Sequence, residues 1–151
     1  MRKINENIEY LDLDNIVQST KAGKLIIDKL KVSKDAALKK FEQKEKALKK
    51  VEEDINKQKN VLSKEELKKK ISDFRKEISS FRDDREKLIN DFNKKKIQEF
   101  EKFFQKITPI IGEYVEKNNI DIVLDKKNIF LANKNNDITN EIIKLIDDKI
   151  K

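Results

Sequence analysis

Two apolar repeats, each with members spaced alternately by three and four residues, constrain this chain more than any other feature. Seven of the ten positions of the first repeat are apolar; they are Leu30, Lys34, Ala37, Phe41, Lys44, Leu48, Val51, Ile55, Gln58 and Leu62. Seven of the nine positions of the second are apolar; they are Leu67, Ile71, Phe74, Ile78, Phe81, Arg85, Leu88, Phe92 and Lys95. This spacing is typical of the contact seam of a coiled coil.

The segment between the repeats, residues 60–64, interrupts their phase. Ser63 is followed three residues later by Glu66, which is the pattern of a capping box at a helix start. We therefore predict an antiparallel hairpin of two helices with its tip at residues 60–64. Each arm of about 35 to 45 residues would extend roughly 50 to 70 Å. The predicted neighbours across the seam are Ile55 with Leu67 and Ile71, Leu48 with Phe74 and Ile78, and Phe41 with Phe81.

Composition agrees with an elongated fold. Only 36% of the residues are apolar and 43% are charged, which is too little apolar surface for one compact core. The net charge is +7, and residues 21–117 carry 28 Lys or Arg against 19 Asp or Glu. The positive charge thus belongs to the helical segment, where it would favour acidic clients, anionic lipid or nucleic acid. Mixed Lys and Glu faces that only keep a helix soluble explain the same pattern.

Several chemistries lack the residues that they need. The chain has no cysteine and no histidine, which excludes the usual zinc sites, disulfides, thiol nucleophiles and imidazole catalysis. The two glycines, Gly23 and Gly112, are too far apart for a phosphate-binding loop. We therefore predict a protein that is not an enzyme, with no catalytic, metal or cofactor-binding residues. No apolar run is long enough for a membrane span or a signal peptide, so an exported protein would be represented here in its mature form.

Short strands and caps are expected at both ends of the chain. Ile8 to Leu13 alternates in the manner of a strand, and Asp14 is placed to cap a following helix, in which we expect a flexure near Gly23. After Phe92 the seam slips in phase, and Pro109 is expected to bend or restart the helix.

The C-terminal segment changes character. Residues 120–124 and 129–132 are two β-like runs that we interpret as a hairpin, and Asp137 is placed to cap a terminal amphipathic helix. The apolar side of that helix would consist of Ile138, Ile142, Leu145, Ile146 and Ile150. Three short strands have exposed edges and a poor core, so the body would be completed by joining copies of itself. The predicted fold is mainly α with a small three-stranded β body at 1–20 and 108–151, and a helical hairpin at 21–107.

Three groups of side chains are candidates for function. The rings of Phe41, Phe74, Phe81 and Phe92 have seam spacing, which favours packing inside the hairpin. Three further rings are too close on one helix to share a partner, so at least one is expected to be available to a client; they are Phe100, Phe103 and Phe104. Two lysine triplets are candidate contacts for anionic surfaces or solvated faces; they are Lys68, Lys69 and Lys70, and Lys94, Lys95 and Lys96. The acidic cluster Asp83, Asp84 and Glu86 lacks the loop spacing of a calcium site.

The layout resembles the Skp/OmpH family of periplasmic chaperones over nearly the whole chain. The resemblance lies in the opening IEYLDLDNIVQST, the tip NVLSKEE, the segment ITPIIGEYVEKNN and the tail IDIVLDKKNIFLANKNNDITNEIIKLI. The tail is the specific part, with Val123, Leu124 and Asp125 at a turn, and Asp137, Ile138 and Thr139 at a helix start.

The resemblance implies a homotrimer whose strands share a small barrel and whose hairpins surround a cavity for unfolded outer-membrane proteins. It implies a periplasmic location and an ATP-independent holdase without cofactors. Residues of the trimerisation body would be Ile8, Tyr10, Leu11, Leu13, Ile122, Val123, Leu124, Ile129 and Leu131. The hairpin seam would include Leu48, Val51, Ile55, Ile71, Phe74, Ile78 and Phe81. Anionic lipid or lipopolysaccharide is a further candidate partner, although no residue of such a site carries over position by position.

Two other classes of protein remain open. A basic coiled coil that binds nucleic acid, or that serves as a structural or interaction module, fits the charged arms but lacks the arginine and aromatic pattern of base recognition. A prefoldin-like chaperone also sets coiled-coil hairpins on a β body. That family places strands between its helices, and residues 60–64 leave no room for them.

Overall fold

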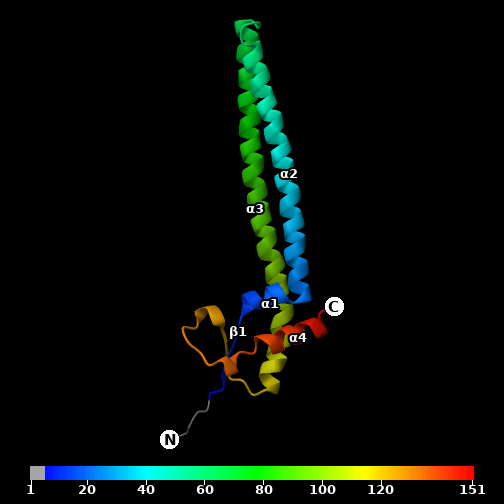
Figure 1. Cartoon of the computed structure of the whole chain (residues 1–151), viewed down its shortest axis with the longest axis vertical. Coiled ribbons are helices and arrows are strands. Elements are labelled where there is room, and N and C mark those ends of the chain that lie inside the picture. The colour runs from blue at the N-terminus through cyan, green and yellow to red at the C-terminus, as the bar shows by residue number, and fades with distance from the viewer. Residues whose placement is uncertain (1–5) are drawn as a thin grey trace. The chain divides into compact units, whose positions relative to one another are not determined.

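The computed structural model describes residues 6–151, and their contacts divide the chain into two compact units (Figure 1). Residues 6–30 together with 97–151 form the first, which we call the body. Residues 31–96 form the second, which we call the arm. The order of elements begins with β1 (Ile8–Leu11), α1 (Leu13–Ser19) and α2 (Lys21–Gln58). It continues with α3 (Lys64–Lys117), β2 (Ile122–Asp125) and α4 (Thr139–Lys149), so the fold is mainly helical with a small sheet.

The arm is the predicted antiparallel helical hairpin, made by the parts of α2 and α3 that lie side by side in Figure 1. Its turn is closed by a capping box. The backbone N–H of Ser63 donates to the Glu66 carboxylate at 3.1 Å, and the N–H of Glu66 donates to the Ser63 hydroxyl at 3.3 Å. These reciprocal bonds satisfy donors that would otherwise be free at the start of α3.

The register of the hairpin follows the predicted seam. The rings of Phe41 and Phe81 meet edge to face, with their centroids 5.7 Å apart. The ammonium of Lys44 also reaches diagonally across the antiparallel pair to the carboxylate of Asp84, at 2.9 Å. The expected pairing of Phe41 with Phe81 is confirmed.

The body has a true hydrophobic core, built where α1 and α4 pack with the last turns of α3. Ile16, Ile142 and Ile146 have no exposed surface. The buried cluster consists of Leu11, Ile16, Phe103, Ile107, Ile110, Ile120, Ile138, Ile142 and Ile146.

The sheet of the body has two strands, and they are parallel. Ile8 of β1 is paired with Ile122 of β2, and the register continues to Leu11 and Asp125. The expected β-hairpin at residues 120–132 is wrong for this structure, because residues 129–132 form no strand.

Local capping explains why the chain does not reverse beside β2. The Asp125 carboxylate accepts from the N–H of Lys127 at 3.3 Å and starts the 3-10 turn η1 (Lys126–Asn128). A second turn, η2 (Lys134–Asn136), returns the chain to β1, where the Asn136 amide donates to the Ile8 carbonyl at 2.9 Å.

Helix starts differ slightly from the expectation. The first helix is capped by Asp12, whose carboxylate accepts from the N–H of Asn15 at 3.0 Å, so Asp14 lies in the first turn and is not the cap. At the other end, the N-cap of α4 is Ile138, which makes no side-chain capping bond, so the expected cap at Asp137 is wrong by one position. Asp137 still binds the helix start, because its carboxylate accepts from the N–H of Thr139 at 3.0 Å. The predicted strand at Ile8 to Leu13 ends at Leu11 because Asp12 begins the cap.

Pro109 does not restart the helix, since α3 continues through it to Lys117. Proline removes one backbone donor, which leaves the carbonyl of Gln105 without its usual partner. Gln105 and Pro109 are both exposed, so water can satisfy that carbonyl. The preceding Thr108 also bonds back, with its hydroxyl 2.6 Å from the Phe104 carbonyl.

The chain turns sharply at Thr20, between α1 and α2. The buried Thr20 hydroxyl donates to the Ile16 carbonyl at 2.8 Å and accepts from the N–H of Gly23 at 3.1 Å. A Cβ at Gly23 would lie 1.9 Å from the carbonyl oxygen of Val17. Gly23 therefore permits close backbone packing at this corner, which is a different role from the flexure that the sequence suggested.

Candidate functional site

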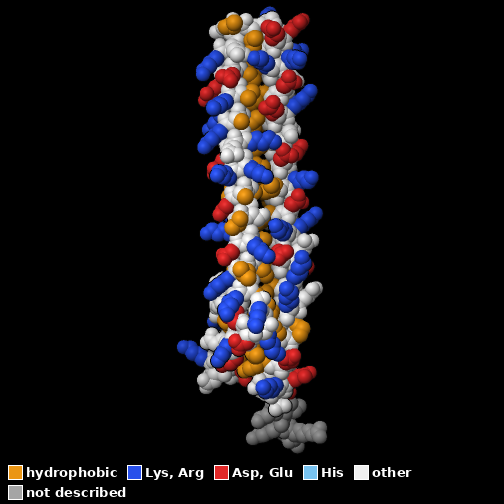
Figure 2. Space-filling view, turned by 90° about the vertical axis from the view of Figure 1, so that its right-hand side faces the viewer, with side chains coloured by type: hydrophobic (Ala, Val, Ile, Leu, Met, Phe, Trp, Pro, Cys, Tyr) orange, Lys and Arg blue, Asp and Glu red, His pale blue; other side chains and the backbone are white. Residues whose placement is uncertain are grey.

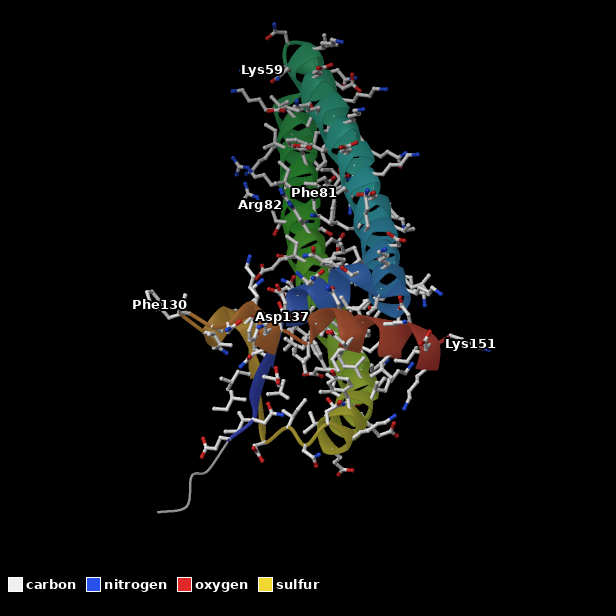
Figure 3. The ribbon with its side chains drawn as sticks, turned by 60° about the horizontal axis from the view of Figure 1, so that its bottom comes forward. Lys59, Phe81, Arg82, Phe130, Asp137 and Lys151 are labelled. Carbon is white, nitrogen blue, oxygen red and sulfur yellow. The ribbon has the colours of Figure 1, made fainter. Side chains whose placement is uncertain are left out.

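The body exposes apolar side chains within a short stretch of sequence. Ile122 and Leu124 on β2 are each 43% exposed, and in the following loop Phe130 and Leu131 are fully or almost fully exposed. Figure 3 shows Phe130 pointing away from the body. Exposing two adjacent large apolar side chains to water is unfavourable, so this stretch is a candidate interaction surface.

The strand edge beside these residues also lacks a partner. On β1, the side away from β2 is used by Asp137 and Ile138, the latter donating its N–H to the Tyr10 carbonyl at 2.9 Å. On β2, the side away from β1 pairs with no strand among residues 6–151. An unpaired strand edge offers backbone donors and acceptors to another chain.

The residues predicted for trimerisation fall into two groups. Tyr10 and Leu11 are buried in the single chain, and Leu13 and Val123 pack against the core. The others remain at the surface to different degrees; they are Ile8, Ile122, Leu124, Ile129 and Leu131.

Phe130 is the most exposed apolar residue of the described chain, yet the sequence analysis did not select it. Of the run 129–132, only Ile129 and Leu131 were predicted to belong to the trimerisation body. The usable signal was an aromatic residue in a loop flanked by Lys126, Lys127 and Asn133.

The arm exposes apolar surface in a different way. Its apolar seam residues are at most half-buried, and no residue of the arm is as buried as the core of the body. Val51 and Leu88 are each 36% exposed, although both occupy seam positions. Figure 2 shows the result as a line of hydrophobic side chains running between charged ones. In Figure 3, Phe81 lies between the helices and Arg82 points outward.

The charged side chains of the arm are mostly basic and exposed. Residues 31–96 contain 22 Lys or Arg against 14 Asp or Glu. Lys64, Lys68, Arg75 and Lys76 surround an open groove of about 690 Å³ on α3 near the turn. Both predicted lysine triplets, at 68–70 and 94–96, are exposed, and Lys70 bonds to the side-chain oxygen of Gln58.

The three aromatic rings within residues 100–104 are buried to different degrees. Phe103 is 2% exposed and meets Phe104 with ring centroids 5.8 Å apart, while Phe104 itself packs against the core. Phe103 is therefore a core residue in this structure and does not offer itself to a client. Phe100 is half-buried.

Three ionisable groups have shifted pKa values, each with a local cause. The Ser63 hydroxyl and N–H stabilise the Glu66 carboxylate and hold its pKa below the ordinary value. A hydrogen bond from Lys149, with its positive charge, lowers the pKa of Glu113. Burial raises the pKa of Tyr114, and the carboxylates of Glu141 and Glu9 add to this effect. Each shift thus follows from a cap, an ion pair or burial within the fold.

The acidic cluster at 83–86 serves the hairpin through Asp84, which pairs with Lys44. Over residues 6–151, no group of three or more acidic side chains is placed to hold a metal ion. In the same part of the chain, no helix has the length and apolar character needed to cross a membrane.

The arm is a helical hairpin with a half-open apolar seam, and the body has an unpaired strand edge, so each unit by itself exposes surface that another chain could cover. The family model described as outer membrane protein (OmpH-like) matches residues 7–146. The chain therefore belongs to the OmpH-like family.

A solved structure has the same fold. It is the crystal structure of a protein proposed to be an outer membrane chaperone (OmpH-like) from Caulobacter crescentus. The TM-score is 0.87 at 15% sequence identity, and the match covers 99% of this chain and 89% of the other. None of the curated proteins compared with the sequence matches it. Family membership supports a chaperone role and a protein without enzymatic activity.

Proposed function

We propose that this protein is an ATP-independent holdase that binds unfolded outer-membrane β-barrel proteins in the periplasm and prevents their aggregation. The observation that carries the proposal is the half-buried apolar seam of the arm, bordered along its length by exposed lysines. Such a surface binds unfolded chains through many weak contacts, none of which depends on one client sequence. Weak contacts presented together raise the effective concentration of binding surface.

The proposed working unit is a homotrimer joined through the body. An unpaired β2 edge, with Ile122 and Leu124 beside it and Phe130 and Leu131 in the next loop, supports association with further copies of the chain. Hairpins from three copies would enclose a space for a client. The exposed lysines would also favour acidic clients and anionic lipid surfaces.

Release in this proposal needs no nucleotide. The sequence has only two glycines, which are 89 positions apart, and so lacks a loop that could hold ATP phosphates. A client would leave as it folds and buries its own apolar side chains, because the contacts with the arm then lose their partners.

The test is aggregation of a β-barrel outer-membrane protein diluted from urea, followed by light scattering. We expect the trimer to suppress scattering at an equimolar ratio to client, and sedimentation to give three copies. Unchanged scattering at a several-fold excess of trimer would refute the holdase proposal, whereas a monomer in sedimentation would refute the assembly.

A double change in the body and a single control change in the hairpin turn separate the effect on assembly from general effects of surface substitution. We expect the combined change Phe130→Ser and Leu131→Ser to weaken the trimer about tenfold or more, because it removes exposed apolar surface at the proposed contact. Val61→Ser, at an equally exposed apolar residue in the hairpin turn, is the control and should leave sedimentation unchanged. Equal effects of the two changes would argue against the body as the assembly surface.

A further inference from the structure

We propose that a groove between the two helices of the arm, in the half remote from the turn, binds large apolar side chains of an unfolded polypeptide that are flanked by acidic residues. This inference rests on the proposed holdase function and assigns a particular client contact within it. The groove encloses about 360 Å³ and is formed by both helices.

The groove exists because the seam is underfilled there. Where Phe41 faces Phe81, two rings fill the space between the helices. In the groove, α2 contributes the small side chains of Ala36 and Ala37, and α3 contributes Leu88 and Phe92. Leu88 remains 36% exposed and Phe92 is half-buried, so an apolar floor stays open to a ligand. Covering it with an apolar side chain would remove water from both surfaces.

The rim of the groove is basic. Lys40 and Lys95 line it, and within residues 6–151 neither ammonium lies within salt-bridge distance of a carboxylate. One acidic residue, Asp91, also lines the groove, so the rim keeps an excess of positive charge.

The charge of the surrounding half of the arm has the same sign. Residues 31–50 and 80–96 carry 14 Lys or Arg against 7 Asp or Glu, whereas residues 51–79 carry 8 against 7. Acidic ligands are thus attracted to the half of the arm that contains the groove.

An apolar floor together with a basic rim favours one kind of ligand. A nucleic acid backbone would satisfy Lys40 and Lys95 but leave the floor of Ala37, Leu88 and Phe92 uncovered. A polypeptide segment with an aromatic or large aliphatic residue between aspartates or glutamates satisfies both parts. Unfolded chains expose such segments, and folded ones bury their apolar residues.

The first experiment removes the charge of the rim. The probe is a fluorescein-labelled peptide in which aromatic residues alternate with aspartates, titrated with the full-length protein and followed by fluorescence anisotropy. We expect Lys40→Gln with Lys95→Gln to weaken peptide binding about threefold to tenfold, since two exposed attractions are lost. The matched control, Lys39→Gln with Lys94→Gln, removes the same charge from neighbouring positions outside the groove and should change binding less than about twofold.

The second experiment fills the groove. Ala37→Leu places extra volume over the floor, and we expect about tenfold weaker peptide binding with unchanged or increased thermal stability. Ala47→Leu is the control, because Ala47 is an exposed alanine on the same helix that does not line the groove. Circular dichroism verifies that all variants remain helical.

A third measurement uses the absence of cysteine from the sequence. An environment-sensitive fluorophore on Ser33→Cys, inside the groove, should report peptide binding, whereas the same label on the exposed Ser80→Cys should not. This readout stays informative if a filling variant fails to fold.

The outcomes separate this inference from the proposed function. Equal losses for the groove and control variants, or peptide binding unaffected by Ala37→Leu, would overturn the groove even if the wild-type protein suppresses aggregation. Selective losses for the groove variants would support it. A wild-type protein that fails to suppress aggregation but binds the peptide with this selectivity would refute the holdase proposal and leave the groove standing.

Discussion

The body and the arm of this protein are built from similar helices but bury their apolar residues to very different degrees. Ile16, Ile142 and Ile146 are completely buried in the body, whereas the seam residues of the arm reach only half burial. The body has several elements that converge on one cluster, and the arm has two helices with solvent on every other side. Two paired helices cannot enclose a core, so the arm retains exposed apolar surface, whereas the body closes around a buried cluster.

The largest effect on this contrast should come from removing a core side chain. We expect Ile142→Ala to destabilise the body by about 2 to 5 kcal/mol, because it loses buried surface and leaves a cavity. Urea unfolding followed by circular dichroism measures the change. A loss below about 1 kcal/mol would mean that the body is no better packed than the arm. Ile89→Ala, at an exposed position on α3, is the control and should cost little.

The two glycines offer a matched test of packing. Gly23→Ala would bring a Cβ against the Val17 carbonyl, and we expect a destabilisation of about 1 to 3 kcal/mol, as is usual for overpacking. Gly112 lies in α3 with nothing within 4 Å of a Cβ, so Gly112→Ala should stabilise by about 0.5 to 1 kcal/mol. Thermal unfolding of both variants shows whether each substitution lowers or raises the stability. Equal effects would show that the corner at Thr20 is loose.

A change in the seam of the arm should have a smaller and more local effect. Phe81→Ala removes a half-buried ring and its edge-to-face contact with Phe41, at an expected cost of about 1 to 2 kcal/mol. Hydrogen exchange should become faster near residues 41 and 81, with little change in the body. A loss of protection throughout the body would contradict the separation of the two units.

The smallest effect should come from the cap of the hairpin turn. We expect Ser63→Ala to destabilise the start of α3 by about 1 kcal/mol, because the N–H of Glu66 loses its acceptor. Hydrogen exchange at residues 64–68 measures it, and Ser80→Ala in mid-helix is the control. Unchanged exchange would show that the capping box is dispensable.

Acid should weaken the same turn. The lowered pKa of Glu66 means that its contribution is complete above the ordinary glutamate value and is lost as the pH falls through the lowered value. The protection of amides near the turn, expressed relative to the intrinsic exchange rate at each pH, should therefore fall below about pH 4 in the wild-type protein. This fall in protection should be smaller in Glu66→Gln, and an identical pH dependence of protection in the two proteins would refute this account.

The sequence predicted the arm better than the body, and the reason is the range of the interactions. The seam repeat, the Ser63–Glu66 cap and the pairing of Phe41 with Phe81 depend on residues that share a helix or lie across one hairpin. In the body, β1 pairs with β2 more than a hundred positions away and in parallel, which no local pattern specifies. The candidate surfaces follow the same division. Lysine exposure was predictable, but the burial of Phe103 and the exposure of Phe130 depend on packing of distant segments.

By itself, the sequence determined the helical hairpin, its turn, its basic character and the absence of cysteine and histidine chemistry. Heptad spacing and capping act over a few residues and need no knowledge of the rest of the chain. Only the tertiary structure decided that residues 129–132 form no strand, that α3 continues through Pro109, and that small alanines leave a groove opposite Phe92. Each of these outcomes depends on which distant groups are present to donate a hydrogen bond or fill a space, and local sequence does not contain that information.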